Sequence, residues 1–389
     1  MKKWLSRNLI ILTLVSLAQD AASELLYPLL PYLVAASVVS GAPIALGLIE
    51  GCAEAAAGFT KLYSGRKSDE IGRKRFVFLG YSLAGIGKAL VIFGTSWSYI
   101  FTGRVTDRIG KGLRSAPRDA LIHDSVPSEH LGKAFGFHRT GDNIGAVFGP
   151  LIALAALALL NDNVRLVAQW ALIPAALSAI LTLFLREIRA TKSKQEVRIE
   201  KARLPKPMKK TIVILALIQL TNIPDALLLL RLYDLDFTVS QVVASYALFS
   251  FVTVIFAFPG GYLADKFSPK IVYAVGLVAF AVAYSTLGLT SNKLIAVMAL
   301  IVYGIFPALT DGVGKAWISQ LSESNHRGKA QGWYQASMNF AVLGAGIWGG
   351  IFWSKEGNQP VLVIAAMGAA VGALYLGSRY LLENLSNRR

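Results

Sequence analysis

The sequence predicts an all-α integral membrane protein built from two similar halves of six spanning helices each. Hydrophobic residues make up 54% of the 389 residues, and the mean hydropathy is +0.52. Charged residues make up only 16%, against about 25% in soluble proteins. Short sequence patterns also recur at a distance of about half the chain. A soluble chain of this composition would have too few polar residues to cover its core, whereas a bilayer solvates an apolar surface.

Twelve segments are long and apolar enough to serve as spanning helices, which need about 20 residues each. We expect them at residues 8–35, 42–62, 75–95, 97–118, 134–160, 166–185, 210–232, 239–262, 270–290, 294–320, 329–353 and 360–382. The only long polar segment contains Pro205 and Pro207 and separates six spans from six. The predicted domains are therefore an N-terminal six-helix bundle at 1–185, a basic cytoplasmic linker at 186–209 and a C-terminal six-helix bundle at 210–389.

The basic residues follow a topological pattern. The net charge is +16, and residues 186–210 alone contain ten Lys or Arg against three acidic residues. The other basic clusters fall in alternate gaps between spans, which is the bias of cytoplasmic loops. We therefore expect a multi-pass protein of the bacterial inner membrane with both termini in the cytoplasm, and we prefer this interpretation to nucleic-acid binding. The single cysteine, Cys52, rules out an internal disulfide.

Three pairs of matching segments indicate duplication of a whole structural unit. Gly65 and Asp69 keep the spacing of Gly261 and Asp265 at an offset of 196 residues. The segment 106–111 matches 310–315 at an offset of 204, and 132–136 matches 328–332 at 196. The matches support spans at 97–118 and 294–320 although both carry charged residues. Duplicated apolar halves are typical of secondary transporters.

Three groups of residues resemble family signatures. The first is the loop after the second span, with Gly65, Asp69, Gly72, Arg73 and Lys74, and its copy with Gly261, Asp265 and Lys266. The second is the antiporter-like motif of the fifth span, with Gly145, Gly149 and Pro150, and the third is Arg104 in the fourth span.

On these residues the chain resembles the major facilitator superfamily, in particular its bacterial drug/proton-antiporter-like branch. The resemblance implies twelve transmembrane helices in two pseudo-symmetric six-helix bundles, a central cavity and alternating access. It also implies a small-molecule substrate and a protein that works as a monomer.

The loop signature has a physical role in gating. Gly65 and Gly261 would let neighbouring helices approach closely. Asp69 and Asp265 would lie near a helix end, where a carboxylate meets a helix N-terminus or an arginine. Such contacts would act as a latch that biases the equilibrium between the two states of the transporter.

Two acidic residues in the first span are the candidates for proton coupling. Asp20 and Glu24 are one helical turn apart and share a face. A charge at this depth costs several kcal/mol unless it faces a cavity or a partner. We therefore predict that Asp20 or Glu24 binds and releases the proton. The alternative is that one of them forms a fixed structural ion pair.

Further ionisable residues in the spans are candidates for substrate binding or charge modulation. Arg104 could neutralise Asp20 or Glu24, or could bind an anionic group of the substrate, with Asp107 as its local partner. Lys111, Arg114 and Arg118 follow at helical repeats and can also be explained as the cytoplasmic end of the helix. We predict an ion pair between Arg139 and Asp142, and a helix kink beside Asp225 because it follows Pro224. The remaining candidates are Arg108, Glu50, Glu54, His138, Arg231, Asp311 and Lys315.

The predicted function is transport and not catalysis. The sequence contains no phosphate-binding glycine loop, no His/Cys metal cluster and no nucleophile triad, so we expect no enzyme activity, no metal and no cofactor other than the proton gradient. Proton antiport that exports a small organic molecule is the first choice. A proton-linked importer of an anionic metabolite or metal chelate is the second, and a non-transporting membrane sensor or scaffold is the third. The C-terminal half would supply shape and aromatic contacts to the substrate site, and the alternative for each residue is a place at the lipid interface or in packing. The residues are Tyr233, Tyr246, Trp317, Trp333, Tyr334 and Asn339.

Overall fold

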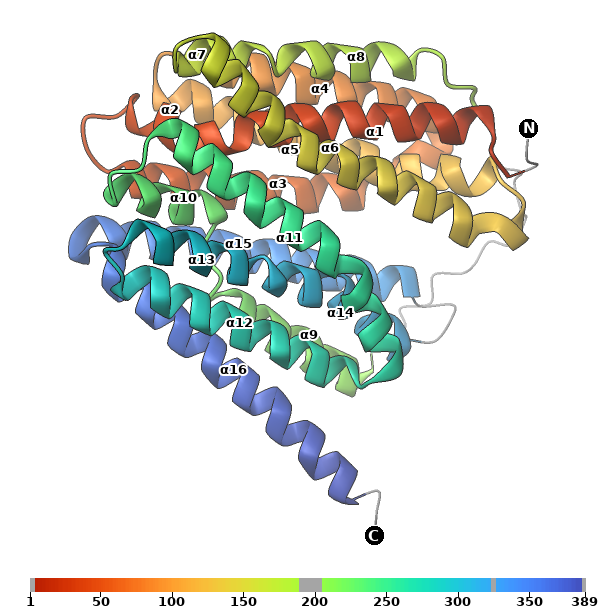
Figure 1. The fold of residues 1–389 in the computed structure, drawn as a ribbon. Coiled ribbons are helices and arrows are strands. Elements are labelled where there is room, and N and C mark those ends of the chain that lie inside the picture. The colour runs from red at the N-terminus through yellow and green to blue at the C-terminus, as the bar shows by residue number, and fades with distance from the viewer. Residues whose placement is uncertain (1–3, 189–204, 323–326, 387–389) are drawn as a thin grey trace. The chain divides into compact units, whose positions relative to one another are not determined.

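The computed structural model describes residues 4–188, 205–322 and 327–386. The secondary structure assigned over these three ranges is helical, without a strand (Figure 1). Most of the predicted linker, residues 189–204, lies outside the described residues.

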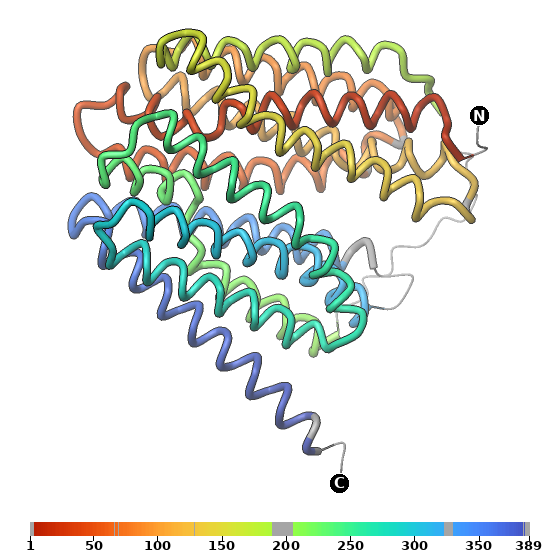
Figure 2. Tube along the Cα trace, viewed as in Figure 1, coloured from red at the N-terminus to blue at the C-terminus, as the bar shows by residue number. Residues whose placement is uncertain are grey.

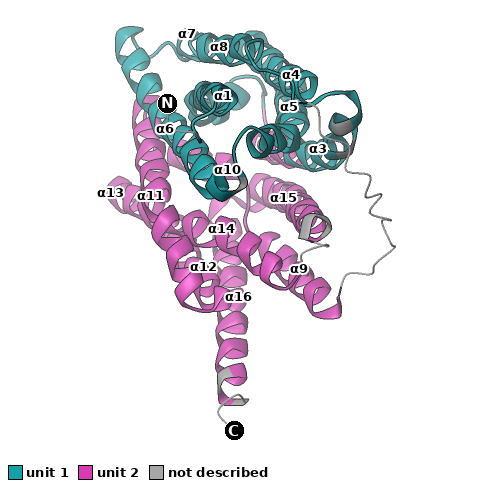
Figure 3. Cartoon of the chain, turned by 90° about the vertical axis from the view of Figure 1, so that its right-hand side faces the viewer, with its two compact units in different colours: residues 1–39, 52–203 teal, residues 40–51, 204–389 magenta. Residues whose placement is uncertain are grey.

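The chain divides into two compact units, coloured separately in Figure 3. Unit 1 contains residues 1–39 and 52–203, and unit 2 contains residues 40–51 and 204–389, so the first part of α3 clusters with unit 2. The helices up to the linker are α1 (Arg7–Leu26), η1 (Tyr27–Leu29), α2 (Leu30–Ala35), α3 (Ala42–Ile71), α4 (Arg73–Phe93), α5 (Trp97–Asp124), η2 (Ser128–His130), α6 (Leu131–Leu159), α7 (Val164–Gln169) and α8 (Leu172–Thr182). The helices after it are α9 (Lys206–Gln219), α10 (Asp225–Asp234), α11 (Val239–Lys266), α12 (Pro269–Leu289), α13 (Lys293–Tyr303), α14 (Ile305–Gln320), α15 (Arg327–Glu356) and α16 (Asn358–Ser386).

The helices agree with the predicted twelve-span fold. Ten stretches of the described residues are long and apolar enough to cross a membrane. The fourth span, α5, is not among them because its charged residues lower its hydropathy, and the seventh is divided between α9 and α10. Outward-facing apolar side chains such as Leu159, Ile173 and Leu374 are 69–74% exposed, as expected of a surface that a bilayer covers.

Several spans are interrupted where the sequence places proline or glycine. In the first span, the α-helix changes to the 3₁₀ turn η1 at Pro28 before α2 continues it. The tenth span is divided at Gly304 into α13 and α14. The seventh span breaks completely at residues 220–224, and the light-green trace in Figure 2 shows the coil between its two halves. Pro224 has no N–H to donate and restricts Ile223 before it, so the expected kink beside Asp225 is a full break.

The backbone groups freed by this break find partners inside unit 2. The indole Nε1 of Trp348 donates to the carbonyl oxygen of Leu220 at 2.7 Å. The hydroxyl of Tyr284 donates to the carbonyl oxygen of Ile223 at 3.3 Å. Non-helical backbone at membrane depth is tolerated only when such groups are satisfied. The break is therefore a built feature of the span.

Glycine allows two close helix contacts in unit 1. A Cβ added to Gly145 of α6 would lie 2.4 Å from the carbonyl oxygen of Leu17 in α1, and one added to Gly149 would lie 2.7 Å from that of Ala21. Likewise, a Cβ on Gly87 of α4 would lie 2.5 Å from the backbone nitrogen of Asp107 in α5. The antiporter-like motif thus packs α6 directly on α1. Pro150 lies inside α6 without ending it.

The close approach that we expected at the loop glycines is not observed. A Cβ added to Gly65 would make an ordinary contact of 3.6 Å with Ala116, and one added to Gly261 would meet nothing within 4 Å. The prediction for these two positions was wrong. The neighbouring Gly260 is the residue in close contact, because its Cβ would lie 2.6 Å from the carbonyl oxygen of Ala308.

Candidate functional site

Three charged side chains form a buried cluster between α4 and α5, which we call the α5 charge cluster. It consists of Lys88, Arg104 and Asp107, which are 1%, 4% and 3% exposed. Asp107 accepts a hydrogen bond from Lys88 Nζ at 2.9 Å and one from Arg104 Nη1 at 3.5 Å. The Arg104 guanidinium also lies over the ring of Tyr27, at 5.3 Å from its centroid. The close contact at Gly87 lets Lys88 reach α5. Asp107 is thus the local partner of Arg104, as expected, and pairs with a second cation as well.

Other basic residues of α5 also have interaction partners. Arg108 Nε lies 2.9 Å from Oε1 of Glu54, so Glu54 is part of an ion pair within unit 1. Arg114 is buried and lies over the ring of Tyr81, with 4.5 Å between the guanidinium carbon and the centroid. Glu50 is buried and lies in the segment that clusters with unit 2. Glu50 and Glu54 therefore belong to different units although they are one turn apart.

A second polar group, which we call the α1–α6 polar chain, links Ser16, Tyr81, His138 and Asp142. Ser16 Oγ lies 3.0 Å from the hydroxyl of Tyr81 and 3.4 Å from Nε2 of His138. The same Nε2 lies 3.6 Å from Oδ1 of Asp142. Arg118 Nη1 donates to Ser16 Oγ at 3.1 Å. The hydrogen-bonded part of this group is Ser16 with Tyr81, His138 and Arg118, whereas the 3.6 Å separation between His138 and Asp142 is an electrostatic contact and not a hydrogen bond.

The two predicted proton carriers lie on the face of α1 that packs against α6. A Cβ on Gly145 would lie 3.1 Å from Cβ of Asp20, and one on Gly149 would lie 2.8 Å from Cβ of Glu24. Both acids are half-buried. Asp20 interacts electrostatically with Lys111, Arg118 and Asp142. The structure thus brings Asp20 to the end of the α1–α6 polar chain.

The expected ion pair between Arg139 and Asp142 does not form. Arg139 is exposed, whereas Asp142 is half-buried and contacts His138. Residues three apart can meet on a helix. Here Asp142 meets the residue four positions earlier instead, on the buried face of α6.

The loop after α3 is held by carboxylates that lie far from it in the sequence. Glu187 accepts hydrogen bonds from the backbone nitrogens of Arg73 and Lys74, at 3.0 and 2.9 Å, and so caps the N-terminus of α4. Arg73 forms an ion pair with Asp124 at the end of α5. Gly72 has φ +120°, which other residues rarely adopt. This carboxylate at a helix N-terminus belongs to Glu187 and not to Asp69, for which the role was predicted; the side chain of Asp69 lies outside the described part.

Charges at the loop affect the titration of Asp124. Desolvation raises the pKa of this carboxyl, but the hydrogen bond from His123 and the charge of Arg73 outweigh it, and the pKa lies below its usual range. The corresponding residues of unit 2, Asp265 and Lys266, lie in the last turn of α11 and not in a loop, and both are exposed. Lys266 Nζ lies 5.8 Å from the centroid of the Phe267 ring.

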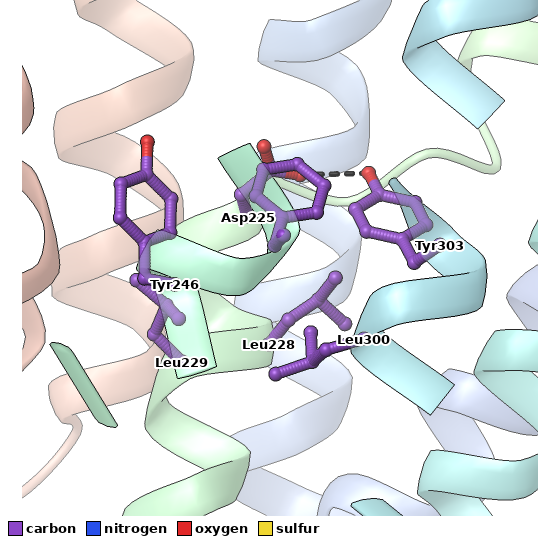
Figure 4. A pocket seen from close by; sticks show the side chains of 7 residues that line it. Asp225, Leu228, Leu229, Tyr246, Leu300 and Tyr303 are labelled. Carbon is purple, nitrogen blue, oxygen red and sulfur yellow. Dashed lines mark hydrogen bonds between the residues drawn. The ribbon is translucent and has the colours of Figure 1, made fainter. Parts of the chain in front are cut away.

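In unit 2, Asp225 lies in a small pocket at the broken span. The pocket is lined by Asp225, Leu228, Leu229, Tyr246, Phe249, Leu300 and Tyr303 (Figure 4). The Tyr303 hydroxyl donates to Oδ1 of Asp225 at 2.7 Å and lies 3.1 Å from Oδ1 of Asn222. The Tyr303 and Phe249 rings are stacked with 5.4 Å between centroids. Tyr246, expected to shape the substrate site, is one of the lining residues.

The other ionisable residues of unit 2 have different environments. Arg231 is buried, and its Nε and Nη2 donate to the carbonyl oxygens of Leu287 and Thr290 at 3.1 and 2.8 Å. It therefore caps the C-terminus of α12. Asp311 and Lys315 are exposed on α14, and Asp311 interacts electrostatically with Tyr273 and Tyr334.

Sequence reasoning missed Ser16, Tyr81, Glu187 and Asp124 as partners of the candidate residues. Ser16 lies one turn before Asp20 on the same helix face, which is a signal that could have identified it. Glu187 and Asp124 carry no local signal, because their partners are more than 50 positions away. The described residues contain no group of three or more His, Cys, Asp or Glu side chains that could hold a metal ion.

Two helical units with charged side chains at membrane depth define a polytopic membrane transporter. The family profile of the Major Facilitator Superfamily matches residues 12–229 and 211–389. The chain belongs to this superfamily and is a secondary transporter.

The chain is 30% identical to an uncharacterised MFS-type transporter of Methanocaldococcus jannaschii over 96% of this chain and 95% of that protein. It is 31% identical to the multidrug resistance protein MdtG of Yersinia enterocolitica over 40% of this chain and 37% of that protein. Its fold is similar to that of the crystal structure of a mutant of the nucleoside transporter NupG, with a TM-score of 0.79 and 16% identity over 96% of this chain and 99% of that one.

Proposed function

We propose that this transporter couples export of a small organic solute to proton entry, with Asp20 and Glu24 as the residues that bind the proton. The proton-binding site lies in unit 1, and the proton gradient across the cell membrane supplies the energy for transport. The protein acts as a monomer in the inner membrane with both termini in the cytoplasm.

The observation that carries this proposal is the position of both acids at the α1–α6 contact, where Cβ atoms added to Gly145 and Gly149 would lie 3.1 and 2.8 Å from the Cβ atoms of Asp20 and Glu24. Asp20 of α1 and Asp142 of α6 interact electrostatically inside spanning helices. A proton bound by either one removes the repulsion between two negative charges. His138 lies 3.6 Å from Asp142 and 3.4 Å from Ser16, so polar side chains surround this pair of carboxylates.

The pairing of the basic residues argues against an anionic solute, which is the substrate class of the importer alternative. Arg108 is paired with Glu54, and Arg104 and Lys88 share Asp107, so these cations are committed to carboxylates of the protein and not to an anionic solute. The similarity to a multidrug resistance protein also supports export. A proton-linked importer of an anionic solute is the second candidate, supported by Lys111, which is exposed on the same helix.

Proton flux in proteoliposomes tests the proposal. The lumen is acidified and loaded with a pH indicator, and ethidium and a panel of small organic cations, anions and neutral solutes are added outside. With an antiporter, a transported solute should enter as protons leave, so the lumen becomes more alkaline. Asp20→Asn and Glu24→Gln should abolish this proton release, whereas Asp236→Asn, an exposed acid in the loop after α10, should leave it unchanged.

Two results would overturn the proposal. In the first, no solute in the panel changes the lumenal pH. In the second, Asp20→Asn and Glu24→Gln both release protons at the wild-type rate. If solute entry instead requires protons to move in the same direction, the importer is correct.

A further inference from the structure

We propose that Asp234, at the outer end of the broken seventh span, is an acid-sensitive contact that holds the short helix α10 to α15 and α16. Neutralising its carboxylate with a proton would release this end of α10. The switch lies in unit 2 and is independent of the proton-binding residues proposed for unit 1.

Helix α10 is joined to the rest of its span by non-helical backbone. Residues 220–224 are non-helical, so α9 and α10 are not one continuous rod. Helix α10 itself is short, with ten residues from Asp225 to Asp234. A short helix with such a connection can tilt through changes in a few backbone dihedral angles, as hinge segments do. The contacts at its far end therefore determine whether α10 stays in place.

The carboxylate of Asp234 contacts two other helices of unit 2. Asn358 Nδ2, at the start of α16, donates to Oδ2 at 2.8 Å, and Trp353 of α15 hydrogen-bonds to the same carboxylate. Arg231, one turn earlier on α10, interacts with it electrostatically. Hydrogen bonds to a charged group are about twice as strong as those between neutral groups. Both contacts therefore weaken when the carboxylate is neutral.

The other polar contacts at this end of α10 do not change at acidic pH. Arg231 donates to two backbone carbonyl oxygens at the end of α12. Lys293 Nζ donates to the backbone carbonyl oxygen of Asp236 at 2.6 Å. Arginine and lysine stay charged in acid, and backbone carbonyl groups do not titrate. Among these contacts, the one made by Asp234 is the one that acid can weaken.

The position of Asp234 lets external protons reach it. The residue is exposed, although Trp353 beside it is buried. Asp234 follows the seventh span and Asn358 follows the eleventh, both on the side opposite to the basic loops. An aspartate side chain that water reaches gains a proton at acidic pH. The hold on α10 thus weakens as the external medium is acidified.

Hydrogen–deuterium exchange of α10 measures this hold without a substrate or a gradient. The whole protein is purified in dodecyl maltoside, and exchange over residues 225–238 is compared at about pH 7.5 and about pH 4.0, corrected for the intrinsic rate. Helix α8, which contains no titratable side chain, is the internal reference. Relative to α8, we expect α10 to exchange about tenfold faster at the acidic pH, because its hydrogen bonds to a charged group are weakened.

Two variants and a matched control assign the effect to Asp234. Asp234→Asn keeps the shape of the side chain without its charge, so α10 should exchange at the faster rate at both pH values. Asn358→Leu removes one donor and should speed exchange of α10 at neutral pH. The control is Asp236→Asn, an exposed acid two positions further on whose backbone, and not its side chain, contacts Lys293. This control should behave as wild type does.

The inference is overturned if exchange of α10 relative to α8 in the wild-type protein does not depend on pH, which requires no variant to fold. It is also overturned if the pH dependence persists unchanged in Asp234→Asn, or if Asp236→Asn has the same effect as Asp234→Asn. None of these results depends on proton flux through Asp20 and Glu24. The switch and the proposed proton coupling can therefore fail separately.

Discussion

At the scale of single residues, the fourth span is held together by charges buried inside the bundle. Asp107 is the shared anion of Lys88 and Arg104, and the three side chains are at most 4% exposed. Removing one member of a buried ion pair leaves an uncompensated charge, which is far more costly than the pair itself is stabilising.

Asp107→Asn is therefore expected to lower the free energy of unfolding by about 3–5 kcal/mol, because two buried cations lose their anion. Lys88→Met should lower the free energy of unfolding by a smaller amount, because Arg104 still pairs with Asp107. Thermal unfolding in detergent, followed by loss of monomer on size exclusion, measures both. Equal losses for the two variants would mean that Asp107 does not serve both cations.

The ion pair of Arg73 and Asp124 should make stability depend on pH. The pKa of Asp124 is lowered in the folded protein, so its contribution is complete above the usual carboxyl range and is lost as the pH falls through the lowered pKa. The difference in melting temperature between wild type and Asp124→Asn should thus be constant near neutral pH and shrink under acidic conditions. A difference that grows on acidification would contradict the direction of this shift.

At the scale of helices, glycine sets the distance between α1 and α6. Gly145→Ala would place a Cβ 2.4 Å from the carbonyl oxygen of Leu17, and α6 would have to move away from Asp20. Overpacking of this kind typically costs about 1–3 kcal/mol. We expect a corresponding loss of thermal stability together with slower proton-coupled flux.

Gly136 on the same helix provides a matched control, because a Cβ there would meet nothing within 4 Å. Gly136→Ala should be neutral or should stabilise the helix by up to about 1 kcal/mol. If Gly136→Ala is as damaging as Gly145→Ala, the loss reflects helix flexibility and not the α1–α6 contact.

At the scale of the whole molecule, the twelve spans place successive loops on alternate sides of the membrane. On a Cys52→Ser background, Thr95→Cys and Ser291→Cys should react with an impermeant maleimide from outside intact cells. Lys133→Cys, in the first turn of α6, and Ser268→Cys, just before α12, lie on the side with excess basic charge and should react only after permeabilisation. Labelling of all four from the same side would reject this topology.

The number and order of the spans follow from the sequence because a bilayer imposes a length of about 20 apolar residues and because the two halves repeat. Some helix ends do not, since α3 continues to Ile71 and α5 to Asp124, beyond the predicted ends at 62 and 118. Gly65 and Asp69 therefore lie inside α3 and not in a loop. The break at Pro224 follows from the chemistry of proline, although the sequence predicted a kink and the structure has a full break. The close contact at Gly65 and Gly261 was predicted wrongly, because small residues permit a close approach without requiring one.

The superfamily fold and the ionisable residues within the spans could thus be predicted from the sequence alone. The pairing of those residues could not. Lys88 meets Asp107, Arg118 meets Ser16, and Glu187 caps α4, through contacts between residues 19, 102 and 114 positions apart in the chain. Such contacts depend on the rotation and offset of each helix, and helices that are apolar on most faces carry too weak a periodic signal to specify either. Packing in three dimensions therefore determined which carboxylates are already neutralised by a neighbouring cation and which ones line a pocket.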